Sequence, residues 1–190
     1  MALLGLALGI WVLIGLVVLV VILFIYYYNK FVTQGNRIDN SLSQIDVQLK
    51  KRADLVPNLI ETVKAYAKHE KSIMTEVTNA RKVLMGAKDL PSKIKAGDNL
   101  QNALKSIFAI AENYPQLRAN ENFLHLQQEL SAIEDKVAYS RQYYNDTILD
   151  FNNSIETFPG TFFAKLYNAK KRQFLEITES ERKLVKVKFD

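Results

Sequence analysis

Residues 38–84 read IDNSLSQIDVQLKKRADLVPNLIETVKAYAKHEKSIMTEVTNARKVL, and apolar side chains recur along this stretch at alternating spacings of four and three. The repeat runs from Ile38 to Leu84, and its only positions that are neither apolar nor aromatic are Arg52 and Glu70. Such a repeat places one apolar stripe along a helix, which packs against other helices. The stretch therefore predicts a helical bundle.

Pro57 lies off this stripe and leaves two arrangements open. The unbroken spacing favours one long helix that is kinked near Pro57. The alternative is a break at Ala53, with Asp54 as the N-cap of a new helix and Pro57 in its first turn. In both arrangements Gly86 is a plausible stop for the helix that carries the end of the stripe.

Two further helices are expected downstream. Residues 88–97 read as a connection with a weak helical turn, and Asp98 is expected to cap the helix that follows. Pro115 ends or kinks that helix, since the residue before a proline avoids the helical region. A last long helix carries an apolar stripe from Phe123 to Ile155 and ends at Pro159-Gly160. We predict an all-α chain, with a helical bundle of short connections behind an N-terminal transmembrane helix.

The segment Ala2–Tyr28 contains no charged side chain and exceeds the roughly 20 apolar residues that span a bilayer. A cleaved signal peptide would have basic residues before a shorter apolar run, and a small-residue cleavage site. Here the run ends in three tyrosines, which suit a membrane interface, so we expect a retained single-pass anchor. Lys30 and Arg37 follow the run and no base precedes it. The positive-inside rule then predicts a cytoplasmic domain at the inner membrane, with the N-terminus outside.

The chain is expected to comprise a transmembrane anchor (residues 1–29), a helical bundle (residues 30–160) and a basic, aromatic tail (residues 161–190). Because the last helix is long enough to run most of the way back, its end should return to the membrane. There the stretch FPGTFFAKLY, residues 158–167, precedes Lys170-Lys171-Arg172. Aromatic and basic residues together favour a membrane interface; the alternative is that the aromatics cover the end of the bundle. Residues 184–189 are expected to be extended.

Convergent catalytic groups are absent from the sequence. There are no cysteines, which removes thiolate chemistry, and only two histidines. His125 and Glu129 have a spacing that can chelate a metal, but one such pair is common on helices. No phosphate-binding loop or nucleophile elbow occurs, and Glu134-Asp135, Asp146 and Asp150 are expected on solvated faces. We predict that the chain is not an enzyme and binds no cofactor or metal.

Four asparagines are spaced by seven residues in two pairs near the membrane end of the expected bundle: Asn29 with Asn36, and Asn145 with Asn152. A spacing of seven puts both members of a pair on one helix face. We expect a polar layer that sets helix register, as a buried asparagine does in coiled coils. The rival interpretation is a surface that binds a partner.

Other apolar residues fall outside the stripes and are candidates for an interaction surface. Val47, Leu55 and Ile60 lie off the first stripe, within the segment 44–64, and Phe162 and Phe163 lie in the tail. Apolar residues outside a stripe face either a partner or a third helix of the bundle.

Several segments together resemble the LemA family of bacterial membrane proteins. They are NRIDNSLSQIDVQLKKRADLVPNLIETVKAYAK at residues 36–68, AENYP at residues 111–115, ANENF at residues 119–123, and Arg141 with Tyr144-Asn145. The resemblance implies an antiparallel up-and-down bundle of four long helices behind a single anchor. It also favours the break near Asp54 and supplies no catalytic residues. The bulky Thr161-Phe162-Phe163 departs from the small or aliphatic residues expected there.

The main functional prediction is a non-enzymatic, membrane-anchored scaffold or adaptor. Two alternatives are a membrane-remodelling or lipid-binding protein and, as the resemblance implies, an accessory factor of a membrane protease in envelope stress. The expected partners are the lipid bilayer, an unidentified membrane protein and further copies of the chain. Nucleic acid ranks last, because the net charge of +5 is modest and the aromatic residues follow the stripes.

Overall fold

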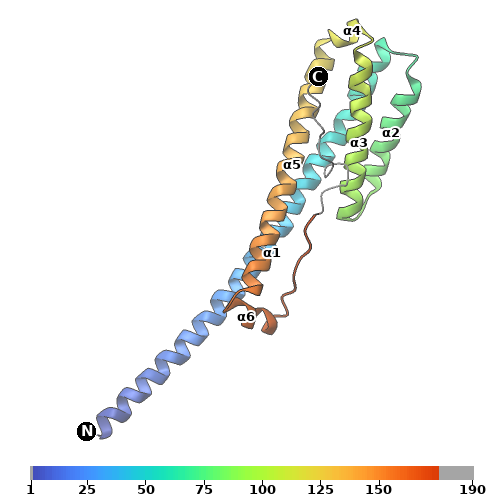
Figure 1. Ribbon diagram of the computed structural model, residues 1–190. Helices are drawn as coiled ribbons and strands as arrows, with labels where there is room; N and C mark the ends of the chain where they lie inside the picture. Colours follow the sequence, from blue (N-terminus) through green and yellow to red (C-terminus); the bar gives the residue numbers. More distant parts are fainter. Residues whose placement is uncertain (1, 176–190) are drawn as a thin grey trace, which may run out of the picture. The chain divides into compact units, whose positions relative to one another are not determined.

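The computed structural model describes residues 2–175, with side chains from Leu8 onward, and all the regular elements in that range are α-helices (Figure 1). They are α1 (Ala2–Tyr66), α2 (Lys71–Gly86), α3 (Leu90–Ala111), α4 (Pro115–Arg118), α5 (Glu121–Glu156) and α6 (Gly160–Leu166). The all-α prediction is confirmed, whereas the extended segment expected at residues 184–189 lies outside the described residues. The chain divides into two compact units, one of Ser41–Tyr143 and one of Met1–Asn40 with Tyr144–Asp190.

The unit of Ser41–Tyr143 is a bundle of α1, α2, α3 and α5, in which successive helices are joined by short turns (Figure 1). The predicted stripes form its core, because apolar side chains at spacings of three and four share one helix face. The stripe residues that are fully buried include Ile45, Val56, Leu59, Leu100, Leu104, Ile107, Phe123 and Leu130. Hydrophobic burial of this face stabilises the bundle.

Helix α1 continues through Pro57 without a break, so the break expected near Asp54 is wrong. A proline inside a helix has no N–H, which leaves the carbonyl four residues earlier without its donor. That carbonyl belongs to Ala53, which is fully buried, and Arg81 of α2 donates to its oxygen from Nε at 2.7 Å. Arg81 therefore replaces the backbone donor that Pro57 lacks.

The first apolar stripe is divided at a turn, not at the proline. Helix α1 ends at Tyr66, and residues 67–70 form a tight turn before α2. Glu70, a polar position of the stripe, lies in this turn and accepts a hydrogen bond of 3.0 Å from the hydroxyl of Tyr114. That hydrogen bond raises the pKa of Tyr114. The charged stripe residue thus lies between helices, where it has a polar partner.

Helix α3 begins earlier than the sequence suggested. Asp89 is its N-cap and accepts a hydrogen bond of 3.0 Å from the backbone of Ser92, while Pro91 occupies the first turn. The backbone N–H and the hydroxyl of Ser92 both donate to Asp89, and these hydrogen bonds lower the pKa of Asp89 because they favour the carboxylate. The predictions of a connection over residues 88–97 and of a cap at Asp98 are therefore wrong. Asp98 lies inside α3 and is half-buried.

The other expected stop signals are confirmed. Helix α2 ends at Gly86, and α3 ends at Ala111, before Pro115 opens the short α4. Helix α5 starts after Asn120, whose side chain accepts a hydrogen bond of 3.0 Å from the backbone of Phe123, and it ends before Pro159-Gly160.

The second unit combines the first part of α1 with the end of α5 and with α6. Gln34 of α1 joins the two long helices through polar contacts: the Ser154 hydroxyl donates to Gln34 Oε1 at 2.6 Å, and Gln34 Nε2 donates to the carbonyl of Asp150 at 3.3 Å. Apolar residues of both helices are buried around these contacts: Phe31, Ile38, Ile148, Phe151 and Ile155.

Among the described residues, α1 is the one helix that is long and apolar enough to cross a membrane. Its side chains from Leu8 to Ile22 are all exposed. A run of exposed apolar side chains of this length is unfavourable in water and favourable in hydrocarbon. The observation agrees with the predicted anchor.

The role of Arg81 can be tested with a double-mutant cycle at Pro57. We expect Arg81→Met to lower the free energy of unfolding by about 1–3 kcal/mol, because the buried Ala53 carbonyl loses its donor. In a Pro57→Ala background the new N–H supplies a donor, so the same substitution should cost less than about 1 kcal/mol. Urea denaturation of the full chain in detergent, monitored by circular dichroism, measures the loss of stability in each background. Lys82→Met is the control, because Lys82 is exposed. Equal losses in the two backgrounds would contradict this role.

Candidate functional site

An aromatic cluster holds α6 against the end of the apolar stretch of α1. Phe163 stacks on Tyr27, with ring centroids 4.5 Å apart and an angle of 7° between the rings, and meets Phe24 edge to face at 5.1 Å. The hydroxyl of Tyr167 donates to the carbonyl of Phe24 at 3.0 Å. Such aromatic pairs add specific geometry to the burial of apolar area. One face of α6 is therefore fixed at Phe24–Tyr27.

The close turn before α6 depends on a glycine. A Cβ atom at Gly160 would lie 2.0 Å from the backbone oxygen of Ser154 and 3.4 Å from Tyr27. The first distance is far below any van der Waals contact, so a larger residue would displace α6 from α5. Gly160 thus allows α6 to begin close to the end of α5 and to reach the aromatic cluster.

Apolar side chains in the turn before α6 and on another side of α6 are exposed. Phe158, Phe162 and Leu166 are spaced by four residues and are 89%, 60% and 56% exposed, respectively. We call these three residues the exposed stripe. Lys165 lies beside them, and Lys170-Lys171-Arg172 follow within a few residues. Exposed aromatic residues with adjacent bases at the end of a transmembrane segment suit the bilayer interface.

Two asparagines of α5 hold the segment that follows α6. Asn152 donates to the carbonyl of Arg172 and accepts from its N–H, both at 2.9 Å. Asn145 donates to the carbonyl of Leu175 at 3.1 Å and accepts from its N–H at 2.8 Å. We call this pair the asparagine clamp. Arg172 also lies near the buried Tyr144, where burial raises the pKa of the tyrosine and Arg172 opposes the shift.

The four predicted asparagines do not form one layer. Asn29 and Asn36 are exposed on α1, whereas Asn152 is buried and Asn145 half-buried. The spacing of seven did identify two residues that act together. Their partner is backbone of the tail instead of a facing asparagine, and a partner of that kind leaves no side-chain signal in the sequence.

The candidate interaction residues are divided in a similar way. Val47 is 49% exposed, while Leu55 and Ile60 are half-buried. Leu55 lines a shallow groove between α1 and α5, together with Gln48, Ala132 and Ile133. In the tail, Phe162 is exposed and Phe163 is buried in the aromatic cluster. Of the five residues, Val47 and Phe162 therefore present the most apolar surface.

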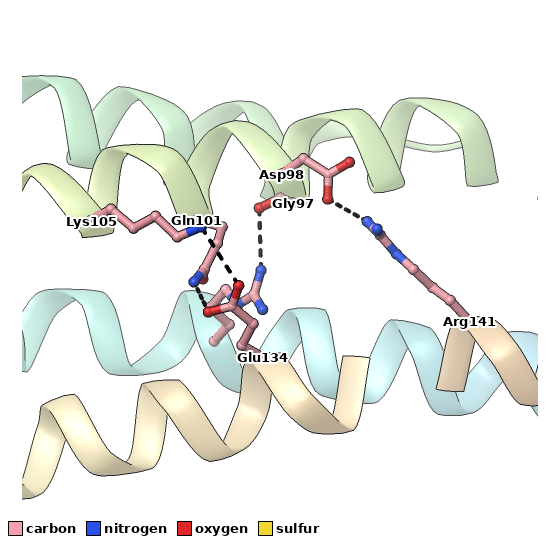
Figure 2. A network of polar contacts seen from close by, with 7 residues as sticks. Gly97, Asp98, Gln101, Lys105, Glu134 and Arg141 are labelled. Carbon is pink, nitrogen blue, oxygen red and sulfur yellow. Dashed lines mark hydrogen bonds and ion pairs between the residues drawn. The ribbon is translucent and has the colours of Figure 1, made fainter. Parts of the chain in front are cut away.

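A polar network lies inside the unit of Ser41–Tyr143, between α3 and α5. Figure 2 shows Arg141 facing Asp98, and Gln101 and Lys105 converging on Glu134. Glu134 is half-buried, so the expectation of a solvated face is wrong for it and right for its neighbour Asp135. A charge inside a helical interface requires partners, and each of these groups has one.

Arg52 of α1 lies at the centre of the same unit. It is 2% exposed and donates from Nη1 to the carbonyl of Gly97 at 3.3 Å. Burial lowers its pKa, the negative charge of Glu134 opposes this, and Arg141 adds to it. An arginine remains charged despite such a shift. The charged position in the first apolar stripe was thus a sequence signal for this network, although the sequence did not reveal Asp98, Glu134 and Arg141 as its surroundings.

The chemistry of this network is structural. Its charged groups are directed at one another and at backbone carbonyls, which leaves no free nucleophile beside a base. Among residues 8–175, no group of three or more His, Cys, Asp or Glu side chains could hold a metal ion. The distance from His125 Nε2 to Glu129 Oε1 is 3.9 Å, and both side chains are exposed.

Comparison with known proteins agrees with this architecture. The sequence matches the LemA family over residues 41–189, most of the chain. The chain belongs to the LemA family. The resemblance seen in residues 36–68 is thereby confirmed, and this LemA-family chain combines a helical bundle with one candidate membrane helix.

Relatives of this LemA-family chain come from different bacteria. The magnetosome proteins MamQ 2 and MamQ 1 of Paramagnetospirillum magneticum are each 23% identical to it, over 78% of this chain and 64% of the relative. The protein LemA of Metamycoplasma hominis is 28% identical, over 68% of this chain and 60% of the relative. The chain thus spans less than two thirds of the length of these curated relatives.

The contribution of the polar network can be measured at Arg141. We expect Arg141→Ala to lower the free energy of unfolding by about 1–3 kcal/mol, because the half-buried Asp98 loses a charged partner. Arg118→Ala is the matched control, since Arg118 is exposed on α4 and should change stability by less than about 0.5 kcal/mol. Thermal and urea denaturation measure the difference. Identical losses for the two variants would show that the network does not support the fold.

Proposed function

We propose that this LemA-family chain is a non-enzymatic scaffold anchored in the cytoplasmic membrane, with its helical bundle in the cytoplasm. The apolar stretch of α1 supports the anchor, and Lys30 and Arg37 directly after it support the orientation.

The observation that carries the scaffold proposal is the filled interior of the unit of Ser41–Tyr143. Large side chains from all four long helices are fully buried there, among them Leu59, Val77, Leu104 and Leu130. Enzymes usually place perturbed ionisable groups in a concave pocket. Here the charged groups of the interior connect helices instead, so the outer surface is the part available for function.

The surface around Val47 is the first candidate for a partner. Val47 is half-exposed, and Leu55 lies two turns further along α1 in the groove with Ala132 and Ile133. Protein–protein interfaces commonly have an apolar centre surrounded by polar and charged side chains. An exposed apolar residue among charged neighbours suits such a centre.

This surface can be tested by photo-crosslinking in living cells. A crosslinking amino acid at Leu55 should capture one discrete membrane-associated protein, and Val47→Asp should abolish that capture by placing a charge in the interface. The same amino acid at the exposed Glu76 of α2 is the matched control and should capture nothing discrete. Crosslinks from Leu55 only to lipid or to further copies of the chain would remove the adaptor role.

A second candidate function, lipid binding or membrane shaping, is supported by the exposed stripe of α6. Phe163 fixes α6 to α1 beside Phe24 and Tyr27, whereas Phe162 and Leu166 of α6 are exposed, as is Phe158 in the turn before it. An apolar helix inserted shallowly beside a transmembrane helix would bind the interface and expand one leaflet. Lys165 and the bases after α6 would favour anionic lipid.

The lipid contact can be measured with a single tryptophan. The chain has one tryptophan, Trp11, so Trp11→Phe combined with Phe162→Trp reports on α6 alone. In vesicles with brominated acyl chains we expect strong quenching at position 162, increased by anionic lipid and reduced by salt. Tyr139→Trp in the same background is the control, since Tyr139 is equally exposed but lies in the other unit. Equal quenching at the two positions would argue against insertion of α6.

A further inference from the structure

The asparagine clamp has the geometry of a receptor for extended backbone. Each asparagine pairs its side-chain amide with both the N–H and the carbonyl of one residue, at 2.8–3.1 Å. This is the exchange of two hydrogen bonds that a residue of an antiparallel β-strand makes with its opposite residue. Asn145 and Asn152 thus provide two strand-like pairing positions on the surface of a helix.

The spacing of the two asparagines matches an extended chain. Seven residues of α-helix rise about 10.5 Å and return to the same face. Three residues of extended chain rise about 10 Å, the separation that Arg172 and Leu175 need. Because Asn152 meets Arg172 and Asn145 meets Leu175, the segment runs antiparallel to α5. A helical segment would rise only about 4.5 Å over three residues and would not reach both asparagines.

Recognition at the clamp depends little on the side chains of the bound segment. The residues from Lys170 to Phe174 are all exposed, so their side chains bury little surface. Lys171 forms an ion pair of 2.8 Å with Glu156, but both groups are exposed and such pairs contribute little. The bound segment is held mainly through its main chain.

We propose that the asparagine clamp also binds the C-terminal segment of a neighbouring copy, so that copies in one membrane are linked by exchange of these segments. A receptor that reads backbone cannot distinguish its own segment from an identical one. The segment follows Asn168, which adopts a left-handed backbone with φ 52°, and only five residues separate α6 from Arg172. This short connection is a suitable hinge for exchange of an identical element between copies.

The membrane anchor favours this exchange over binding of a free peptide. Anchored copies hold their clamps and their C-terminal segments at the same depth beside the bilayer, which raises the effective concentration of a neighbour's segment. The inference rests on the anchor of the proposed function and is independent of the partner at Val47.

The absence of cysteine from the chain allows a direct test. Two tagged full-length copies are expressed together, one with Asn152→Cys and the other with Arg172→Cys. The Asn145–Leu175 pairing remains in both. We expect a disulfide-linked dimer after mild oxidation of membranes. Asn153→Cys with Arg172→Cys is the matched control and should give little dimer, since Asn153 is exposed on another face of α5.

Two further variants make the result decisive. Both cysteines in one chain should give an internal disulfide, and its absence would overturn the clamp itself. Adding Asn145→Leu to the Asn152→Cys copy removes two hydrogen bonds and should reduce the dimer about tenfold. Internal disulfide without mixed dimer would overturn exchange between copies and leave the clamp as a strap within one chain. Since crosslinking at Leu55 is measured separately, failure of exchange is distinguishable from failure of the scaffold proposal.

Discussion

The continuity of α1 depends on a single donor to the carbonyl oxygen of Ala53. Pro57 cannot supply the N–H that this oxygen would receive in an ordinary helix, and a fully buried carbonyl without a donor is costly. Arg81 reaches it from α2 at 2.7 Å. The same α1 supplies buried residues to both compact units, among them Ile38 to one and Leu59 to the other. A break at Pro57 would divide the helix that both units share.

Hydrogen bonds from side chains to the backbone of another segment recur in this chain. Arg81 serves the carbonyl freed by Pro57, Arg52 binds the carbonyl of Gly97, and the asparagine clamp binds the extended tail. In each case the partner is a main-chain group. Some of these groups have no backbone partner, and others are carbonyls that can accept a second hydrogen bond. These contacts set which helix faces meet, whereas the apolar stripes supply most of the stabilisation.

The short helix α6 packs against the end of the apolar stretch of α1 and also exposes apolar side chains. Phe163 fixes α6 against Tyr27, and the exposed stripe consists of Phe162 and Leu166 of α6 with Phe158 before it. Gly160 makes this arrangement possible, because no larger residue fits beside Ser154. In this LemA-family chain, the seven residues of α6 thus connect the end of α5 to the tail held by the asparagine clamp.

The apolar periodicity and the stop signals determined the helical class, the long last helix, the ends at Gly86 and before Pro159, and the membrane helix. These features depend on local backbone preferences and on which face must be buried, and both are written in neighbouring residues. The sequence also marked Arg52 and the pair Asn145 and Asn152 as unusual. Only the tertiary structure decided what these residues meet. The passage of α1 through Pro57 depends on Arg81, 28 positions from Ala53, and the clamp depends on backbone that is 20 and 30 positions away. Apart from proline, every residue carries the same main-chain N–H and carbonyl, so a side chain's contact with them leaves no pattern that a sequence can display.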